Sequence, residues 1–161
     1  MKTENKTRRR AAAWLLALCL LPVLVGCGGA SAEIGGAESY LGFWSHTERP
    51  DALCVFVYEQ TDASVSFVAE ATRYSANGNI SQITYIRQEA VALQDGVGAF
   101  RFTDTFGNSG TGTVTLKEGT LSLSFTLSGE MQGMWCIDRA AGSYTKTKEL
   151  SETVFDPDDY R

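Results

Sequence analysis

The spacing of apolar side chains constrains the fold of this chain more than any other feature. Between residues 120 and 127, Thr and Ser alternate with four apolar residues: Leu121, Leu123, Phe125 and Leu127. Because successive side chains of a strand point to opposite faces, this period of two predicts a β-strand with one apolar and one hydroxyl-bearing face. Residues 64–67 and 99–102 repeat the alternation. Residues 52–58 are apolar throughout, which predicts a strand covered on both faces.

Turn-forming residues separate these runs at intervals of about 10–18 residues. They lie at Gln60-Thr61-Asp62, Asn77-Gly78-Asn79, Asp95-Gly96, Gly107–Gly110, Glu118-Gly119 and Ser128-Gly129-Glu130. Asn-Gly and Asp-Gly supply the positive φ angles of tight hairpins. We therefore expect an all-β domain: an antiparallel up-and-down meander of about eight strands. Such a meander closes into a small barrel because closure removes its free edges.

The N-terminus has the layout of an export signal. Five basic residues, Lys2, Lys6 and Arg8 to Arg10, precede an uncharged and mostly apolar run at residues 11–25. That run is shorter than the about 20 residues of a membrane-spanning helix. We expect a signal helix that directs secretion.

The signal ends in Leu24-Val25-Gly26-Cys27, which resembles the lipobox of bacterial lipoproteins. The resemblance implies cleavage before Cys27 and a diacylglycerol on its thiol. Cleavage there gives a signal peptide (1–26). Composition and the strand pattern divide the rest into a Gly-rich lipidated tether (27–39), a β-barrel domain (40–148) and an acidic disordered tail (149–161). The resemblance also implies location on the extracytoplasmic face of the cell membrane or the outer membrane. The alternative is an uncleaved N-terminal helix with an incidental Cys.

The charge of the mature chain limits the classes of partner that it can bind. The signal holds five of the 14 basic residues and one of the 19 acidic ones. A chain beginning at Cys27 thus has 9 basic and 18 acidic side chains, a formal net charge of −9. So acidic a domain is a poor partner for nucleic acid or for an anionic membrane surface. Solubility outside the cell is sufficient to explain this charge, and attraction to a cationic partner is the alternative.

Two cysteines, Cys54 and Cys136, remain in the mature domain besides Cys27. A pair in an exported domain predicts a disulfide, with two buried thiols as the alternative. Cys136 and Trp135 face opposite ways in an extended chain, so a bridge belongs on the outer wall if Trp135 lies inside. Cys54 then also faces outward, together with Phe56 and Tyr58. This consequence argues against the bridge, because it exposes two aromatic residues unless the tether or the C-terminal tail covers the early strand.

The segment Gly42-Phe43-Trp44, at the entry of the meander, resembles the first motif of the lipocalins and other calycins. That resemblance implies that Trp44 closes one end of the barrel and that a basic residue from the last part of the chain packs over it. Arg139 is the residue in the matching position. The same Gly-x-Trp start, together with Tyr144-Thr145-Lys146 near the end, is similar to small clostridial-type lipoproteins.

We find no catalytic or metal-binding constellation. His46 is the single histidine and lies in a polar run, so we expect a solvated loop residue and no metal site. The segment Gly107–Gly112 precedes a strand instead of the helix that a phosphate-binding loop requires, so we expect a hairpin turn. No Gly-x-Ser-x-Gly motif is present. We expect no enzyme activity and no cofactor, and a solvated tail around Asp156.

The aromatic residues suggest a binding function. A barrel of this size does not bury all of them, and Tyr74, Tyr85 and Phe106 are the expected exposed ones because they lie beside turns. We expect a lipid-anchored extracytoplasmic binding protein for a small apolar or amphipathic ligand. The alternative is a protein-interaction module of the envelope, such as an assembly factor or an inhibitor of a secreted hydrolase.

The anchor is directly testable. We expect Cys27→Ala to abolish lipid incorporation and to release or mislocalise the protein, because a thiol is needed to form the thioether. Metabolic labelling with a radioactive fatty acid, followed by detergent phase partitioning, measures this. A substituted protein that still carries labelled lipid would show that the lipobox assignment is wrong.

Overall fold

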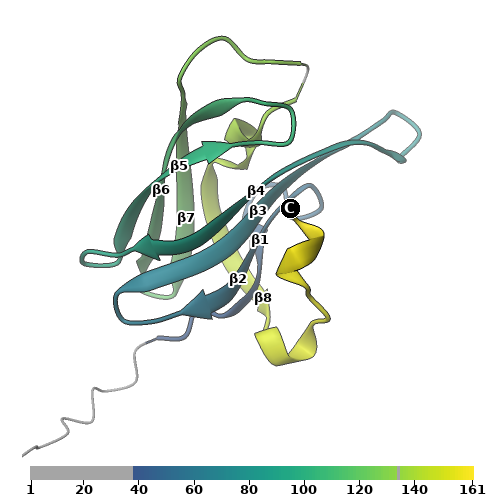
Figure 1. Cartoon of the computed structure of the whole chain (residues 1–161). Coiled ribbons are helices and arrows are strands. Elements are labelled where there is room, and N and C mark those ends of the chain that lie inside the picture. The colour runs from purple at the N-terminus through teal and green to yellow at the C-terminus, as the bar shows by residue number, and fades with distance from the viewer. Residues whose placement is uncertain (1–37, 134) are drawn as a thin grey trace, which may run out of the picture. The chain divides into compact units, whose positions relative to one another are not determined.

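The computed structural model describes residues 38–133 and 135–161, which form a single antiparallel sheet of eight strands (Figure 1). The strands are β1 (Gly42–His46), β2 (Leu53–Gln60), β3 (Ser64–Tyr74), β4 (Ile80–Ala92), β5 (Val97–Thr103), β6 (Ser109–Lys117), β7 (Thr120–Leu127) and β8 (Gly142–Lys148). Three short 3-10 helices, η1 (Ile137–Ala140), η2 (Leu150–Glu152) and η3 (Pro157–Asp159), complete the fold. The lipobox and most of the tether lie outside the described residues.

The strand order is β4-β3-β2-β1-β8-β7-β6-β5, so the first and last strands pair. The two outermost strands, β4 and β5, are joined by only a few hydrogen bonds, so the barrel is not fully closed there. A bridge between Gln94 and Val97 connects them at the turn, and Gln88 Nε2 donates to the carbonyl oxygen of Arg101 at 3.1 Å. The predicted all-β meander is therefore confirmed as a nearly closed eight-stranded barrel.

Tyr40 and Trp44 close the end of the barrel from which β1 starts. Trp44 is 2% exposed, and its ring stacks on that of Tyr40 with centroids 5.6 Å apart. Its Nε1 donates to the carbonyl oxygen of Tyr40 at 2.8 Å. The predicted packing of Arg139 over Trp44 is wrong: Arg139 is exposed on η1, and Tyr40 takes the stacking position.

Helix η1 fills the opposite end of the barrel. Strand β8 begins only opposite Leu123, in the middle of β7, so the preceding residues are free to fold inward. Cys136, Ile137 and Ala140 are fully buried, and η1 contacts β2, β3, β4 and β7. Side chains from the two ends and from the wall thus fill the interior, which is a packed apolar core.

Two glycines make this packing possible. The ring of Phe100 lies over Gly112 on the neighbouring strand, where a Cβ would stand 2.4 Å from the ring. Gly142 has a φ of 145° and lies against the ring of His46, so a Cβ there would collide with Nε2 at 2.2 Å. An aromatic ring over a strand glycine restores the packing that the missing side chain would give.

The prediction that His46 is a solvated loop residue is wrong. His46 ends β1 and is 6% exposed, with its ring edge-on to Tyr144 at 5.2 Å. Its Nδ1 accepts from the backbone N–H of Glu48 at 3.1 Å, which leaves the proton on Nε2 to donate to the carbonyl oxygen of Ala141 at 3.3 Å. The ring is structural: it joins β1 to the start of β8.

A buried carboxylate ties the β5–β6 turn to the segment before η1. Asp104 is 5% exposed and accepts from the backbone N–H groups of Phe106 (2.9 Å), Asn108 (2.9 Å) and Ile137 (3.1 Å). The Asn108 amide also donates to both carboxylate oxygens, and its own oxygen accepts from the backbone N–H of Gln132 at 2.5 Å. The predicted hairpin turn is present here, with every contact of the carboxylate made inside the protein.

We expect Asp104→Ala to lower the free energy of unfolding by about 2–4 kcal/mol, because the buried N–H of Ile137 and the Asn108 amide lose a charged acceptor. Urea unfolding followed by tryptophan fluorescence measures the loss. Asp62→Ala, in the exposed β2–β3 turn, is the control and should change stability by less than about 0.5 kcal/mol. A similar small effect at Asp104 would contradict the structural role of the turn.

Candidate functional site

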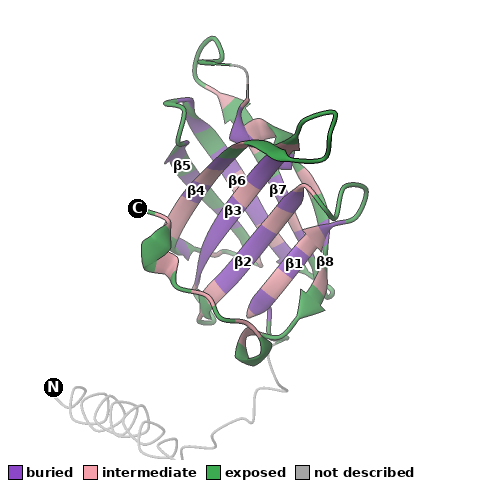
Figure 2. Ribbon diagram, turned by 90° about the vertical axis from the view of Figure 1, so that its right-hand side faces the viewer, coloured by how far each residue is buried: buried purple, intermediate pink, exposed green. Residues whose placement is uncertain are grey.

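The outer surface of the barrel differs between its two halves. Strands β6 and β7 present Thr and Ser outward in register, for example Thr113 beside Ser124. Strands β1 to β4 also present apolar side chains outward, among them Phe56, Val68 and Tyr85. Figure 2 shows that the residues of β1 to β3 are mostly buried or half-buried. Phe56 and Val68, both on the outer face, are only 8% and 2% exposed. Strand β2 is therefore covered on both faces, as residues 52–58 predicted.

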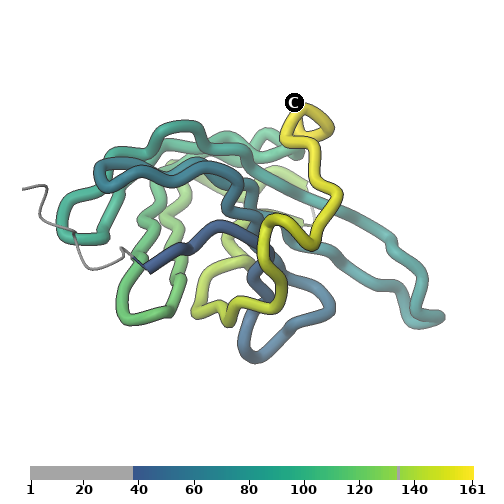
Figure 3. Tube along the Cα trace, turned by 90° about the horizontal axis from the view of Figure 1, so that it is seen from below, coloured from purple at the N-terminus to yellow at the C-terminus, as the bar shows by residue number. Residues whose placement is uncertain are grey.

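The C-terminal segment, residues 149–161, provides the cover. Its backbone runs along the outer side of the sheet (Figures 2 and 3). Phe155 stacks on Phe56 with ring centroids 3.8 Å apart, and Tyr160 meets Tyr85 edge-on at 5.0 Å. The prediction of a disordered tail is thus wrong. The acidic composition of this stretch predicts disorder. It is ordered because its two aromatic residues pack on outward aromatic side chains of β2 and β4.

Charged groups hold the end of this segment. Arg87 Nη1 donates to the carbonyl oxygen of Pro157 at 2.7 Å and to Asp158 Oδ1 at 3.1 Å. Arg161 Nη2 lies 2.8 Å from the other carboxylate oxygen of Asp158. Hydrogen bonds from Arg161 and then from Arg87 lower the pKa of Asp158 below its ordinary value. Asp158 and Arg161 are exposed and Arg87 is half-buried, so these pairs position the segment more than they stabilise it.

A groove of about 360 Å³ lies on the outer wall beside the C-terminal segment. We call it the outer groove. Strands β1 to β4 line it with Phe43, Leu53, Cys54, Phe56, Val68, Glu70, Thr72, Tyr74 and Ile80. The β1–β2 loop adds Pro50 and Asp51, and the C-terminal segment adds Val154, Phe155 and Tyr160.

Glu70 is the polar centre of the outer groove. Its side chain is half-buried, and it accepts hydrogen bonds from Thr72 Oγ1 at 2.9 Å and from the Tyr160 hydroxyl at 3.4 Å. Burial, followed by the charge of Glu70, raises the pKa of Tyr160 to about 12. Asp51 is the other acidic residue of the outer groove. The residues that line the groove include no Lys, Arg or His.

The predicted disulfide between Cys54 and Cys136 is wrong, because both are free thiols on opposite sides of the wall. Cys54 faces the outer groove, whereas Cys136 points into the core beside η1. The inward turn of the chain at Cys136, with Trp135 left only half-buried, separates the two. Burial raises the pKa of each thiol to about 12, with a further contribution from Glu70 at Cys54.

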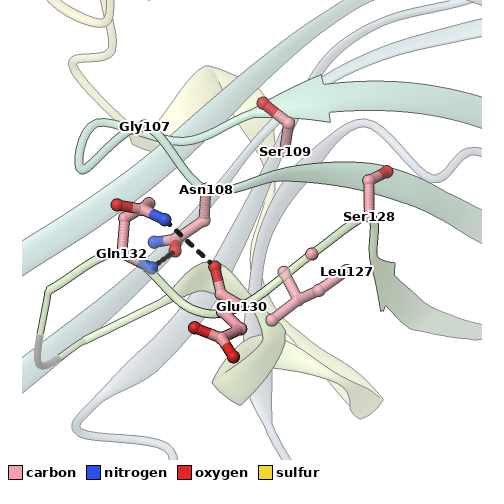
Figure 4. A pocket seen from close by; sticks show the side chains of 8 residues that line it. Gly107, Asn108, Ser109, Leu127, Ser128, Glu130 and Gln132 are labelled. Carbon is pink, nitrogen blue, oxygen red and sulfur yellow. Dashed lines mark hydrogen bonds between the residues drawn. The ribbon is translucent and has the colours of Figure 1, made fainter.

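A second hollow, of about 250 Å³, lies at the rim between the β5–β6 turn and the segment after β7 (Figure 4). Its polar groups already pair with one another. Gln132 donates through its backbone N–H to Asn108 and through its side chain to the carbonyl oxygen of Glu130 at 3.3 Å. With few apolar side chains and satisfied amides, this hollow has little to offer a ligand.

Of the aromatic residues that the sequence analysis placed at the surface, Tyr74 and Phe106 are 44% and 37% exposed. Tyr74 belongs to the outer groove, whereas Phe106 lies at the other rim in the β5–β6 turn. Tyr85 is half-buried under Tyr160. Gly42, predicted beside Trp44, lies at the start of β1 against the backbone of Lys148. Sequence reasoning missed Glu70 and the groove-lining role of Phe155.

No family model, curated protein or solved structure matches the chain significantly, so its class is defined by its fold: a small antiparallel barrel with a covered outer wall. Within residues 38–133 and 135–161, no group of three His, Cys, Asp or Glu side chains is arranged to hold a metal ion. None of the helices in that part of the chain has the length and hydropathy that a membrane span requires.

We expect Phe155→Ala to lower the free energy of unfolding by about 1–2 kcal/mol and to increase the alkylation rate of Cys54, because the stack on Phe56 is lost. Iodoacetamide modification at pH 8, followed by peptide mapping, measures the rate. Val154→Ala is the matched control, since Val154 is fully exposed. Equal Cys54 rates in the two variants would show that Phe155 does not cover the outer wall.

Proposed function

We propose that this protein is a lipid-anchored, extracytoplasmic binding protein that takes a small amphipathic ligand in the outer groove. One observation carries the proposal. The barrel interior, where a lipocalin-like protein would hold its ligand, is packed with side chains, whereas the outer wall has an aromatic-lined groove.

The dimensions and lining of the groove support a small ligand. Ligand sites are commonly about 300–1,000 Å³, mostly apolar, with a few polar groups that fix orientation. The outer groove is about 360 Å³ and combines five aromatic rings with Glu70, Thr72 and Asp51. The lipobox resemblance at Leu24–Cys27 and the acidic mature chain support attachment at the membrane and a ligand encountered outside the cytoplasm.

The β3–β4 hairpin favours a second candidate function, recognition of an envelope protein. The hairpin projects beyond the barrel (Figures 1 and 3), and its side chains Tyr74, Ile80 and Ile83 are 44%, 58% and 39% exposed. Ile83 is not among the groove-lining residues. A protein partner would therefore depend on Ile83, whereas a small ligand would not.

Binding of the uncharged dye Nile red to the Cys27→Ala protein tests the proposal, since that protein is expected to be free of lipid and detergent. Cys54→Trp places an indole in the outer groove and should weaken dye binding at least about tenfold by steric exclusion. Thr126→Trp places the same side chain on the exposed outer face of β7 and should leave binding unchanged. Equal dye affinity in the two variants would contradict a ligand site in the groove.

A further inference from the structure

We propose that the ligand of the outer groove is a small organic cation, an ammonium group attached to an aromatic or alkyl body. This inference rests on the proposed function, since it names the chemical class of ligand for the same groove. Two features carry it: a half-buried carboxylate that takes part in no ion pair among the described residues, and a row of aromatic side chains in the lining of the same groove.

The first step is the charge balance of Glu70. The four ion pairs among the described residues are Arg87–Glu89, Arg87–Asp158, Lys146–Glu149 and Arg161–Asp158, and none includes Glu70. Its partners are the hydroxyls of Thr72 and Tyr160, which are neutral donors. An ionised carboxylate accepts about four hydrogen bonds, so these two leave capacity for a further donor. A cation is the partner that best compensates a carboxylate for partial loss of water.

The second step is the aromatic lining. Four rings form one continuous row in the lining: Phe43 lies edge-to-face with Phe56 at 5.3 Å, Phe56 stacks on Phe155 at 3.8 Å, and Phe155 stacks on Tyr160 at 5.6 Å. The face of an aromatic ring attracts a cation, and sets of such rings are a common way to bind quaternary ammonium groups. The same rings give apolar contact to the uncharged part of the ligand, so one groove serves both ends of an amphipathic cation.

The charges of the groove argue against other ligand classes. Glu70 and Asp51 both line it without any Lys, Arg or His, so an anionic ligand would meet two like charges. A purely apolar ligand would displace water from Glu70 and give no hydrogen bond in return. A small cation with an apolar body satisfies both the carboxylate and the rings.

The test compares benzyltrimethylammonium with neopentylbenzene, which has the same shape but carbon in place of the charged nitrogen. Isothermal titration and ligand-observed NMR on the Cys27→Ala protein measure both affinities. We expect the cation to bind at least about tenfold more tightly than its isostere. Glu70→Gln keeps the size and hydrogen-bonding capacity of the side chain, and it should remove this preference while leaving neopentylbenzene binding unchanged. Asp62→Asn makes the same change of net charge in the exposed β2–β3 turn and should leave the preference intact.

Each outcome is decisive. Equal binding of the cation and the isostere, with both weakened by Cys54→Trp, would overturn the cationic ligand and leave the groove as a binding site. A cation preference that Asp62→Asn reduces as much as Glu70→Gln would show a general effect of net charge and would also overturn the inference. Absence of binding by both compounds, and by Nile red, would overturn the proposed function together with it.

Discussion

Strand β2 is apolar on both faces, and the rest of the structure follows from this constraint. Val55 and Val57 point inward and join the packed core. Cys54 and Phe56 point outward, where Phe56 would lie against water if nothing covered it. The stack of Phe155 on Phe56 provides that cover, and it fixes the path of the C-terminal segment across the wall. The outer groove is the space that this segment leaves uncovered.

The filled interior places the candidate site outside the barrel. Trp44 with Tyr40 at one end and η1 at the other leave the core to side chains. Glycines such as Gly112 let the rings of β5 lie flat against β6, which tightens the packing further. An eight-stranded barrel has an interior that side chains can just fill, and here the aromatic and aliphatic core fills it. The apolar surface in excess of the core therefore appears on the outer wall.

Local sequence patterns were sufficient to predict the barrel. The alternation at residues 120–127 follows from the pleat of a strand, and the turn residues Asp95-Gly96 follow from the geometry of a hairpin. Both are local patterns, so the strand meander could be predicted. The requirement for a cover over Phe56 also followed from the sequence. The predicted bridge between Cys54 and Cys136 is absent. That prediction depended on the direction in which the side chain of Cys136 points, and Cys136 follows an irregular segment whose path the sequence does not indicate. Nothing in the local pattern around Trp135 signals the inward turn that buries Cys136.

The candidate site was less predictable because its parts are distant in sequence. Glu70 is an isolated acid in a strand, and only the fold brings Tyr160 to its carboxylate. Asp156 and its acidic neighbours predicted a solvated tail, because acidic residues dominate the composition of this segment. The two aromatic residues that flank them, Phe155 and Tyr160, were not expected to find partners. Stacking of Phe155 depends on a tertiary contact across about 100 residues of chain. Pairings of this kind are set by the whole fold, and a single sequence gives no sign of them.

The central claim is that the ligand binds on the outer wall and not in the barrel interior. Methyl-labelled protein titrated with a spin-labelled alkylammonium tests it most directly, because paramagnetic broadening reports the distance of each methyl group from the ligand. We expect the strongest broadening at Val68 and Ile80, which line the outer groove. Strongest broadening at Val57 and Leu123, inside the barrel, would contradict it.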